Sequence, residues 1–445
     1  MRGARGRALP VLTLRGRCLI GGGLALAMAG VVLGEVSLVQ LAVFVLALPL
    51  LAALGVIRNR FRISTRRSIS PARVPRGALA EVVVELGSTD DRRGGLWLLT
   101  EQLPAALGPS PRYTVSGLPS GGTALLRYAV AGRVRGRYEL GPLRLRVVDP
   151  FGLVERTASG TGTVPLVVVP RVRPLEDAGP GVEQGRGGSG AHRSIATSGD
   201  DDVSVREYRR GDDLRKVHWR ATARTGELMV RMEERPWHPQ GTLLLDTRSR
   251  AHLLAPARRD AAPLPGPPGD DCPPGDSLEW LVEAAASIGS ALARRGSAVR
   301  VVTDAGELAA SPGRTGLRAD ELLDRLATVG PSRVPDLRSA IETACRAAGD
   351  GPLICLLGAV GPDDVAPLAQ LRPGRGSDVA VLLDVTGWAA PAGRGRRPAR
   401  DVLGLQREEA ATLLTAAGWR VVVAGAGQGV ADAWALAAAP ARMSA

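Results

Sequence analysis

Two apolar runs near the amino terminus constrain this chain more than any other feature. No charged residue occurs between Cys18 and Gly34 or between Val36 and Ile57, and only Glu35 separates the two runs. A helix needs about 17 to 25 apolar residues to cross the roughly 30 Å hydrocarbon core of a bilayer. Because a single residue leaves room only for a tight turn, the sequence predicts a transmembrane helical hairpin.

Arginines flank both outer ends of the predicted hairpin. Residues 1–67 contain ten arginines and one acidic residue, a net charge of +9 in a chain whose net charge is +13. Because basic flanks are retained on the cytoplasmic side, we expect a protein of the cell (inner or plasma) membrane with all following domains in the cytoplasm. A cleaved signal peptide is the alternative. The immediate second apolar run and the basic segment 58–67 argue against it.

The rest of the composition limits the classes of protein that the chain can form. A length of 445 residues allows two or three domains, and 45% hydrophobic but only 3% aromatic residues imply aliphatic cores. Lys216 is the only lysine, and the chain beyond residue 67 has a net charge of only +4, which argues against a nucleic-acid-binding patch. The four cysteines show no CxxC pair and no metal-ligand spacing, so we expect reduced thiols.

Residues 68–175 have the pattern of short β-strands. Apolar or alternating runs are separated by Gly, Pro, Ser and Asp, and no helical period competes with them. The runs lie at 82–86, 96–99, 125–130, 143–148 and 164–169. Several strands at this close spacing favour an antiparallel β-sandwich. The segment has no clustered His, Cys or acidic residues, which favours a structural or docking role.

From residue 241 onward, predicted strands alternate with predicted helices. This alternation implies a parallel, doubly wound sheet with helices on both faces. The strands are expected at 243–245, 298–302, 353–357, 379–383 and 421–424, and the helices at 278–294, 319–327, 334–348, 364–371, 408–417 and 430–438. Sites in such sheets lie at the carboxyl ends of the strands, where Asp246 follows the first strand and Asp384 a later one.

Three segments rich in Gly, Pro, Ser or Arg are predicted to be flexible, namely 176–202, 256–277 and 388–400. The predicted organisation is a basic N terminus with the hairpin (1–67), a β-sandwich (68–175), a flexible linker (176–202), a charged segment of helix and strand (203–240) and an α/β domain (241–445).

Several enzyme classes are excluded because their motifs are missing. A P-loop needs a lysine directly before Ser or Thr, whereas Lys216 is followed by Val217. The four histidines include no i, i+4 pair for an HExxH zinc helix, and the α/β part has no GxSxG elbow. The segment 425–429 lies between a strand and a helix but lacks the third glycine of a dinucleotide-binding loop, so we interpret it as an ordinary turn.

The charged segment 203–240 is the richest in polar side chains. Asp212 suits an N-cap, Asp213 suits the positive end of a helix, and Gly226 suits a helix end. A strand is expected to begin at residues 228–230. One face of the predicted helix would carry Leu214, Val217, His218 and Ala221.

Two interpretations of this segment remain open. It is either a structural helix fixed by Asp–Arg pairs or a charged docking face for another protein, and the structural one is favoured because short charge-rich helices are usually structural or solvated. The residues concerned are Gly211, Asp212, Asp213, Arg215, His218, Trp219, Arg220 and Arg224.

The run from Arg209 to Arg231 closely resembles the signature of the family called domain of unknown function 58. The runs Arg135–Leu143 and Asp149–Leu153 resemble that family as well. The resemblance implies a membrane-anchored protein with a von Willebrand factor A-like domain. It also implies an adaptor or substrate-handling partner of MoxR-type AAA+ ATPases, beside which such proteins are commonly encoded.

The resemblance also implies where a metal ion would bind. Von Willebrand factor A domains hold Mg²⁺ through an Asp-x-Ser-x-Ser loop, helped by a later Thr and Asp, and oxygen ligands suit this hard cation. After Asp246, both expected serine positions are occupied by Arg248 and Arg250. Two guanidinium groups would repel a dication and could pair with Asp246. We therefore expect a degenerate loop, of which Asp246 and Ser249 remain, that binds no metal or only a weak one.

We expect a non-enzymatic, membrane-tethered scaffold or adaptor that binds protein partners, among them a MoxR-type ATPase, with no catalytic residue and no cofactor. One alternative is an envelope-associated hydrolase, which would need Asp246, His218 and an acid to converge in one pocket. The other is a nucleic-acid-binding protein that uses the Arg-rich loops, whose affinity would fall steeply with salt.

Overall fold

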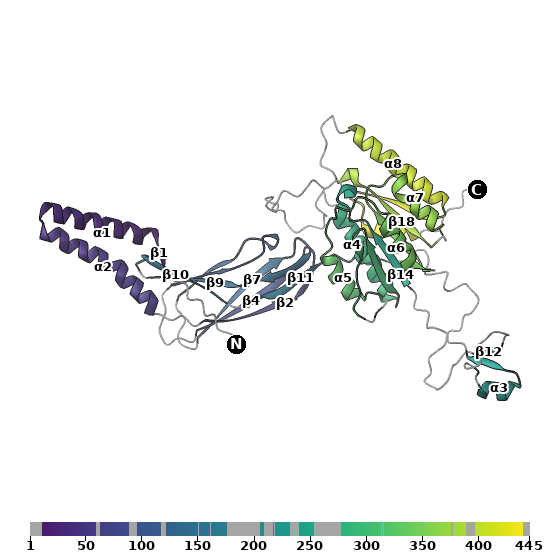
Figure 1. Ribbon diagram of the computed structural model, residues 1–445, viewed down its shortest axis with the longest axis horizontal. Coiled ribbons are helices and arrows are strands. Elements are labelled where there is room, and N and C mark those ends of the chain that lie inside the picture. Colours follow the sequence, from purple (N-terminus) through teal and green to yellow (C-terminus); the bar gives the residue numbers. More distant parts are fainter. Residues whose placement is uncertain are drawn as a thin grey trace. The chain divides into compact units, whose positions relative to one another are not determined.

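The computed structural model describes most of the chain, and its elements are shown in Figure 1. The described residues are 11–58, 63–88, 96–116, 122–149, 151–160, 162–175, 205–208, 217, 219–231, 240–252, 277–312, 314, 316–349, 351–374, 377–388 and 397–438. They form two compact units, one mainly from residues up to Arg171 and the other mainly from the residues after it. The predicted linker 176–202 and residues 256–276 of the second flexible segment lie outside the described residues.

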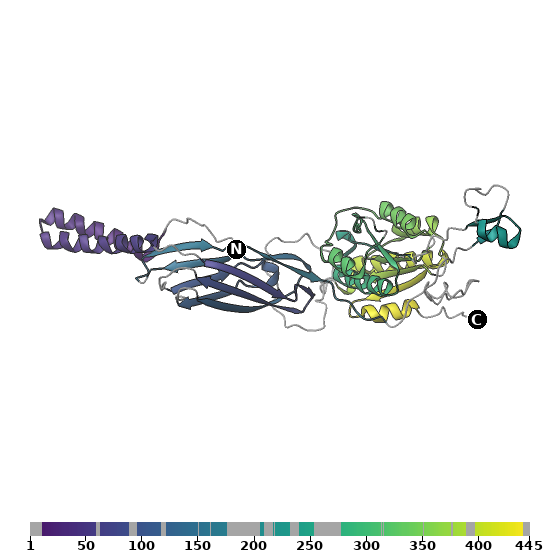
Figure 2. The same ribbon diagram turned by 90° about the horizontal axis from the view of Figure 1, so that it is seen from below.

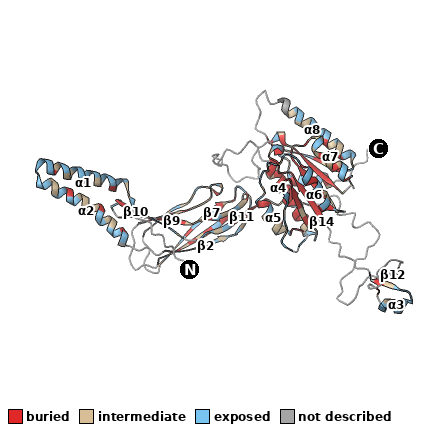
Figure 3. Ribbon diagram, in the orientation of Figure 1, coloured by how far each residue is buried: buried red, intermediate tan, exposed pale blue. Residues whose placement is uncertain are grey.

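The two predicted apolar helices are confirmed. Helix α1 (Leu14–Leu33) and helix α2 (Val36–Arg58) are joined through Gly34, whose φ of 69° is left-handed, and Glu35. Both helices are long and apolar enough to cross a membrane, and most of their surface is exposed (Figure 3). A Cβ on Gly23 would lie 2.8 Å from Leu46, and one on Gly30 would lie 2.8 Å from Val39. Small residues thus let the antiparallel helices approach closely (Figures 1 and 2).

The predicted antiparallel sheets are also confirmed, in three groups. The five-stranded sheet has the order β1 (Val11–Leu12), β10 (Val154–Ser159), β9 (Leu143–Val148), β5 (Leu96–Glu101), β6 (Arg112–Ser116). One three-stranded sheet contains β2 (Ile63–Ser70), β4 (Leu79–Ser88) and β7 (Thr123–Ala131), and the other β3 (Arg73–Pro75), β11 (Val164–Val169) and β8 (Gly136–Leu140). A 3-10 turn, η1 (Ala105–Leu107), lies between β5 and β6. Among these strands only the β3–β11 pair is parallel.

One hydrophobic cluster joins the three sheets. It contains residues from each of them, for example Leu86 of β4, Leu145 of β9 and Leu166 of β11. Trp97 is the one aromatic among its fully buried members in the described chain, as expected from the low aromatic content. Five strands match the predicted runs. Strands β1, β2, β3, β6, β8 and β10 were not predicted. In β2 and β10, charged residues interrupt the apolar pattern, and these strands form by hydrogen bonding to more apolar neighbours.

The second unit contains the predicted α/β sheet. Its order is β16 (Gly306–Glu307), β15 (Ala298–Thr303), β14 (Gln240–Leu245), β17 (Leu353–Leu357), β18 (Val379–Asp384), β19 (Arg420–Gly425). All neighbours are parallel except β15 and β16. The helices are α4 (Ser277–Arg294), α5 (Ala319–Ala327), α6 (Arg338–Ala348), α7 (Pro362–Leu371), α8 (Arg397–Ala416) and α9 (Val430–Ala438).

Helices cover both faces of this sheet (Figures 1 and 2). Leu243 lies next to Gly289 of α4, whereas its neighbour Leu244 belongs to a buried cluster with residues of α6, α7 and α8. Alternate residues of β14 thus point to opposite layers, and the strand is buried from Gly241 to Leu245. The first strand therefore ends inside the domain, with Asp246 at its carboxyl end.

Three predictions for the α/β part are wrong at their boundaries. Helix α6 begins at Arg338 rather than at 334, because Pro335 disfavours a helical residue before it. Helix α8 begins eleven residues before the predicted 408, at Arg397. The predicted flexible segment 388–400 is ordered at both ends, since Trp388 is buried against Trp280 with ring centroids 6.4 Å apart and residues 397–400 are helical.

Candidate functional site

Asp246 lies at the carboxyl end of β14 and is completely buried. Its backbone N–H donates to the carbonyl of Leu356 at 2.9 Å, and its Oδ2 accepts from the N–H of Gly358 at 3.3 Å. A carboxylate in this environment needs a cation or several donors, because burying an uncompensated charge is costly. The cation comes from the same loop.

Arg248 supplies that cation. Its Nε and Nη2 donate to the two carboxylate oxygens of Asp246, each at 2.9 Å, and its Nη1 donates to Oδ1 of Asp364 at 2.8 Å. The Arg248 side chain has no exposed surface. Burial alone would lower the pKa of this guanidinium, but hydrogen bonds to Asp246 and Asp364, together with their charges, raise it above its usual range. Arg248 is therefore a permanent cation between two carboxylates.

This geometry does not fit a divalent metal ion. Both oxygens of Asp246 point at the Arg248 guanidinium, where a cation bound to Asp246 would have to lie. The hydroxyl of Ser249 donates to the carbonyl of Ser332 at 2.7 Å. Among the described residues, no group of three His, Cys, Asp or Glu side chains could hold a metal.

Arg250 does not pair with Asp246. Its Nη2 lies 3.1 Å from Oδ1 of Asp364, and more than half of its side chain, 57%, is exposed. The two arginines of the degenerate loop therefore differ in environment, although the sequence presents them alike. Arg248 is part of the core and Arg250 lies at its rim.

A second buried carboxylate near this loop was not predicted. Oδ1 of Asp304 accepts from the N–H of Thr247 at 2.7 Å and from its hydroxyl at 2.6 Å, and Oδ2 accepts from the hydroxyl of Ser332. Asp304 follows β15, the neighbour of β14 in the sheet. Asp246 and Asp304 share one sequence signal, an acidic residue directly after a buried strand, and this signal could have identified Asp304. These bonds fix the loop, and we assign them a structural role.

His252 and Ser277 form a buried pair beside the loop. Nε2 of His252 lies 2.9 Å from the carbonyl of Asp246, and Nδ1 lies 2.9 Å from the Ser277 hydroxyl. Since a carbonyl can only accept, Nε2 carries the hydrogen, and a neutral ring accepts from Ser277 through Nδ1. This is the arrangement of a nucleophile and its base, but Ser277 is completely buried, which prevents contact with a substrate.

Two further positions considered in the sequence, Asp384 and the turn 425–429, make contacts with neighbouring residues. Asp384 accepts from the Thr386 hydroxyl at 2.6 Å and lies 2.9 Å from Nη1 of Arg407. In the turn 425–429, the carbonyl of Gln428 accepts from Nε1 of Trp280 at 2.8 Å. A Cβ on Gly429 would lie 2.9 Å from the carboxylate of Asp432, so an acidic group borders this turn.

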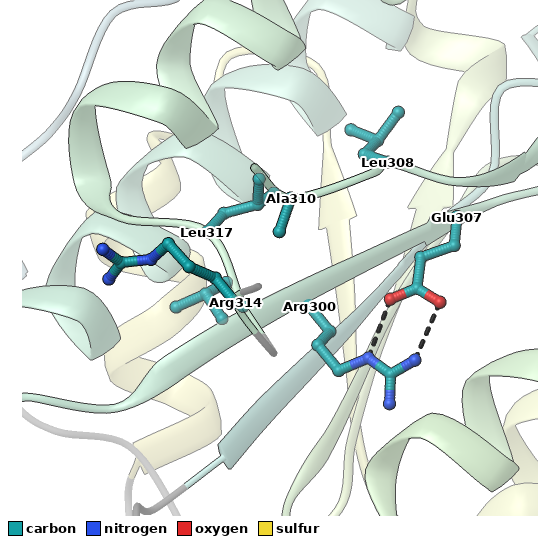
Figure 4. Close-up of a pocket in the computed structure, with 8 residues that line it drawn as sticks. Arg300, Glu307, Leu308, Ala310, Arg314 and Leu317 are labelled. Carbon is teal, nitrogen blue, oxygen red and sulfur yellow. Dashed lines mark hydrogen bonds and ion pairs between the residues drawn. The ribbon is translucent and has the colours of Figure 1, made fainter. Parts of the chain in front are cut away.

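A pocket of about 220 Å³ lies at the edge of the sheet next to β15 (Figure 4). Arg300 makes two bonds to the Glu307 carboxylate, at 2.7 and 2.8 Å, on one side of the pocket. The exposed Arg314 and the apolar Leu308 and Leu317 also line it. Arg300, which belongs to β15, is thus already neutralised by Glu307, and the pocket lies away from the carboxyl end of β14.

The predicted charged segment forms a small structure that we call the signature module. It consists of β12 (Val205–Glu207), Val217, α3 (Trp219–Thr225) and β13 (Met229–Arg231). Strands β12 and β13 are antiparallel, the Thr222 hydroxyl accepts from the N–H of Met229 at 3.0 Å, and Gly226 ends the helix with a φ of 77°. The helix end and the following strand are confirmed.

The prediction that Val217 lies on the helix face is wrong. Val217 forms an antiparallel bridge with Val230, and both are buried. A β-branched residue is well suited to such pairing, and the described helix begins only after it, at Trp219. Gly211, Asp212, Asp213, Leu214, Arg215 and His218 lie outside the described residues.

Helix α3 presents the other predicted residues to solvent. Trp219 is 71% exposed, Arg220 and Arg224 are exposed, and the helix contains no buried residue. Neither arginine makes an ion pair with a residue that the structure describes. Asp212 and Asp213, the acidic residues of this segment, lie outside the described residues, so the structural interpretation by Asp–Arg pairs stays a prediction.

Because Arg248 already neutralises the carboxylates of the loop, we expect Mg²⁺ to leave the stability of the α/β domain unchanged. A ligand that binds the native state at a hundred times its Kd raises the free energy of unfolding by about 2.7 kcal/mol. The melting temperature of the full chain in detergent should be the same in millimolar Mg²⁺ and in EDTA. A higher melting temperature in Mg²⁺ would contradict this assignment.

Part of the chain matches a family model in sequence. Residues 204–255 match the family model described as "Protein of unknown function DUF58". No curated protein matches the chain.

Solved structures give only partial similarities. The CARDB domain of a Pyrococcus furiosus protein in complex with di-metal ions has 16% identity and a TM-score of 0.19, over 25% of this chain and 96% of that chain. The Pseudomonas fluorescens alkylpurine DNA glycosylase AlkC bound to DNA has 14% identity and a TM-score of 0.17, over 30% and 38%. A Listeria innocua β-glucosidase with gluconolactone has 12% identity and a TM-score of 0.15, over 23% and 16%. Similarities at these TM-scores identify neither a fold nor a function.

The segment matched in sequence contains both features described above. The signature module ends at Arg231 and the Asp246 loop ends at His252, so both lie within residues 204–255. The similarity to the family described as Protein of unknown function DUF58 is thus carried by residues 204–255.

Proposed function

We propose that this protein is a non-enzymatic, membrane-tethered scaffold that binds a protein partner through the signature module. The observation that carries the proposal is the exposure of Trp219, Arg220 and Arg224 on a helix that buries none of its own residues. Trp and Arg are the residues most enriched at the energetic centres of protein interfaces. An exposed indole contributes no hydrophobic stabilisation to the isolated chain. Its exposure is best explained if a partner buries it in a complex.

The chemistry of α3 indicates the partner surface. Arg220 and Arg224 are four residues apart and so lie on one side of the helix, and Trp219 directly precedes Arg220 in the sequence. A complementary surface would offer an apolar pocket bordered by carboxylates. We propose a MoxR-type AAA+ ATPase as the partner, on the family resemblance of the sequence.

The rest of the chain supplies the tether and the framework in this proposal. Helices α1 and α2 span the cell membrane, and the Arg-rich ends keep both sheet-containing parts in the cytoplasm. The antiparallel sheets form a β-sandwich, and the α/β part is a von Willebrand factor A-like domain in which Arg248 replaces the metal ion. The guanidinium of Arg248 is already bonded to Asp246 and Asp364, and Ser277 is buried, so neither side chain is available to a substrate. These observations support a binding role rather than a catalytic one.

Co-purification from solubilised membranes tests the proposal. We expect the ATPase to co-purify with the full chain, and the variant Trp219→Ala/Arg220→Gln/Arg224→Gln to bind it at least about thirtyfold more weakly, because each hot-spot side chain contributes about 2 kcal/mol or more. A matched control is Leu436→Ala/Arg294→Gln/Arg295→Gln, which changes an equally large set of exposed side chains in the α/β domain.

The control should retain the partner, and both variants should keep the melting temperature of the wild type because all six residues are exposed. Retention of the ATPase by the α3 variant would contradict docking through the signature module. Repeated absence of any ATPase from the wild-type preparation would contradict the choice of partner.

A further inference from the structure

The loop from Asp149 to Leu153 joins β9 to β10 at the base of the hairpin. The N–H of Thr13 donates to the carbonyl of Leu153 at 2.9 Å, and the Thr13 hydroxyl donates to the carbonyl of Gly152 at 2.6 Å. Strand β1 pairs with β10 directly before α1 begins. The loop is therefore fixed to the first residues of a helix that is long enough to cross a membrane.

Side chains of the loop and of both helices pack together at this base. Leu153 and Val154 are buried with Val56 of α2, and Leu19 of α1 and Ala52 of α2 pack against them. The register set by the Gly23 and Gly30 contacts brings residues 15–17 of α1 level with residues 52–54 of α2. The loop thus lies where the apolar part of the hairpin begins, which in a bilayer is the headgroup region.

Asp149 holds the loop in a fixed conformation. Its Oδ1 accepts from the N–H groups of Leu153 at 2.6 Å and Val154 at 2.8 Å, and its Oδ2 accepts from the N–H of Phe151 at 3.1 Å. Asp149 is itself buried. The backbone of Phe151 is therefore fixed by its hydrogen bond to Asp149, while most of its side chain is exposed rather than packed in the protein interior.

The surface around the loop is apolar and basic. Phe151 is 66% exposed and Leu14 is 77% exposed. Arg15 and Arg17 are exposed, and neither makes an ion pair with a described residue. A Cβ on Gly152 would lie 3.7 Å from Nη1 of Arg15, so this guanidinium lies directly over the loop. The exposed ring of Phe151 and the side chains of Arg15 and Arg17 thus lie at the same end of the hairpin, next to the loop.

We propose that Phe151, Arg15 and Arg17 form a contact site for anionic phospholipids on the inner surface of the membrane. The proposal rests on the membrane anchoring proposed above and extends it from the helices to a loop of the sheet domain. Apolar side chains such as Phe and Leu on interfacial segments are buried at the boundary between headgroups and acyl chains, and arginines near the surface attract anionic headgroups. The site continues the exposed apolar surface of α1 and α2, which favours lipid over a soluble partner as its occupant.

Photocrosslinking in vesicles tests this site. The full chain is reconstituted into phosphatidylcholine vesicles with phosphatidylglycerol as a minor component, and p-benzoylphenylalanine replaces one residue at a time. The probe at Phe151 is compared with Phe44, in the middle of α2, and with Leu79, in β4. Both controls are similarly exposed, at 64% and 62%. Leu79 lies at the end of β4 farthest from the hairpin, because β2 begins near α2 and pairs there with Ser88.

We expect lipid adducts from Phe151 and Phe44 and none from Leu79. In the Phe151 adducts the ratio of phosphatidylglycerol to phosphatidylcholine should exceed that of the vesicle by about fivefold for each arginine. The variant Arg15→Gln/Arg17→Gln should retain the Phe151 adducts and lose this enrichment. Lipid adducts at Phe44 without any at Phe151, or a protein adduct at Phe151, would overturn the site and leave the anchor intact. Adducts at neither position would contradict the anchor itself.

Discussion

Replacing Arg248 with Met is expected to lower the free energy of unfolding of the α/β domain by about 3–5 kcal/mol, because it leaves the carboxylates of Asp246 and Asp364 without their buried cation. In a domain of this size such a loss lowers the melting temperature by roughly 10 °C. The full chain in detergent can be compared with the wild type by thermal unfolding and by hydrogen exchange of strands β14 and β17.

Arg250 provides the matched control for this prediction. It contacts the same carboxylate of Asp364, but its side chain is 57% exposed, so Arg250→Gln should cost at most about 1 kcal/mol. If lost charge compensation is the cause, Asp246→Asn in the Arg248→Met background should recover part of the stability. Equal effects of the two arginine variants would contradict a special role of Arg248.

Replacing Arg67 with Met is expected to destabilise the antiparallel sheets by a similar amount, about 3–5 kcal/mol. Nε of Arg67 donates to Oε1 of Glu101 at 2.7 Å, Nη2 donates to Oε2 at 3.3 Å, and both side chains are almost completely buried. The negative charge of Glu101 would then lie uncompensated close to Tyr128, whose pKa is already raised by burial and by that charge.

The neighbouring Arg66 is the control for Arg67. Its side chain is 76% exposed and lies 3.9 Å from Glu85, so Arg66→Gln should change the free energy of unfolding by at most about 1 kcal/mol. Hydrogen exchange separates the two parts of the chain, because Arg67→Met should accelerate exchange in β4 and β7 and leave β14 unchanged. Faster exchange in β14, or none in β4, would show that the pair does not stabilise these sheets.

Local patterns were sufficient to predict most of the fold. The uncharged runs predicted both apolar helices, and alternating strands and helices predicted the mostly parallel sheet. In β17, α5 and α9 the predicted and observed bounds agree. Polar strands such as β2 were missed, because β2 adopts a strand conformation through its pairing with β4 and not through an apolar pattern of its own.

The sequence placed Asp246 at the end of the first strand and raised the possibility of its pairing with arginine. It could not distinguish Arg248 from Arg250, because the difference depends on Asp364, more than a hundred residues away. Asp304 and Ser332 were missed for the same reason. In the charged segment, the sequence identified Trp219, Arg220 and Arg224 as candidates, but it could not show that they are exposed, since that depends on the packing of the whole module.

Photocrosslinking in native membranes from position 219 tests docking through the signature module most directly. With p-benzoylphenylalanine in place of Trp219, we expect one discrete adduct that contains a MoxR-type ATPase, strongly reduced when Arg220 and Arg224 are changed to Gln. The same probe at Leu436, which is 59% exposed in α9, should not form it. No protein adduct from position 219, or the same adduct from both positions, would contradict the proposed function.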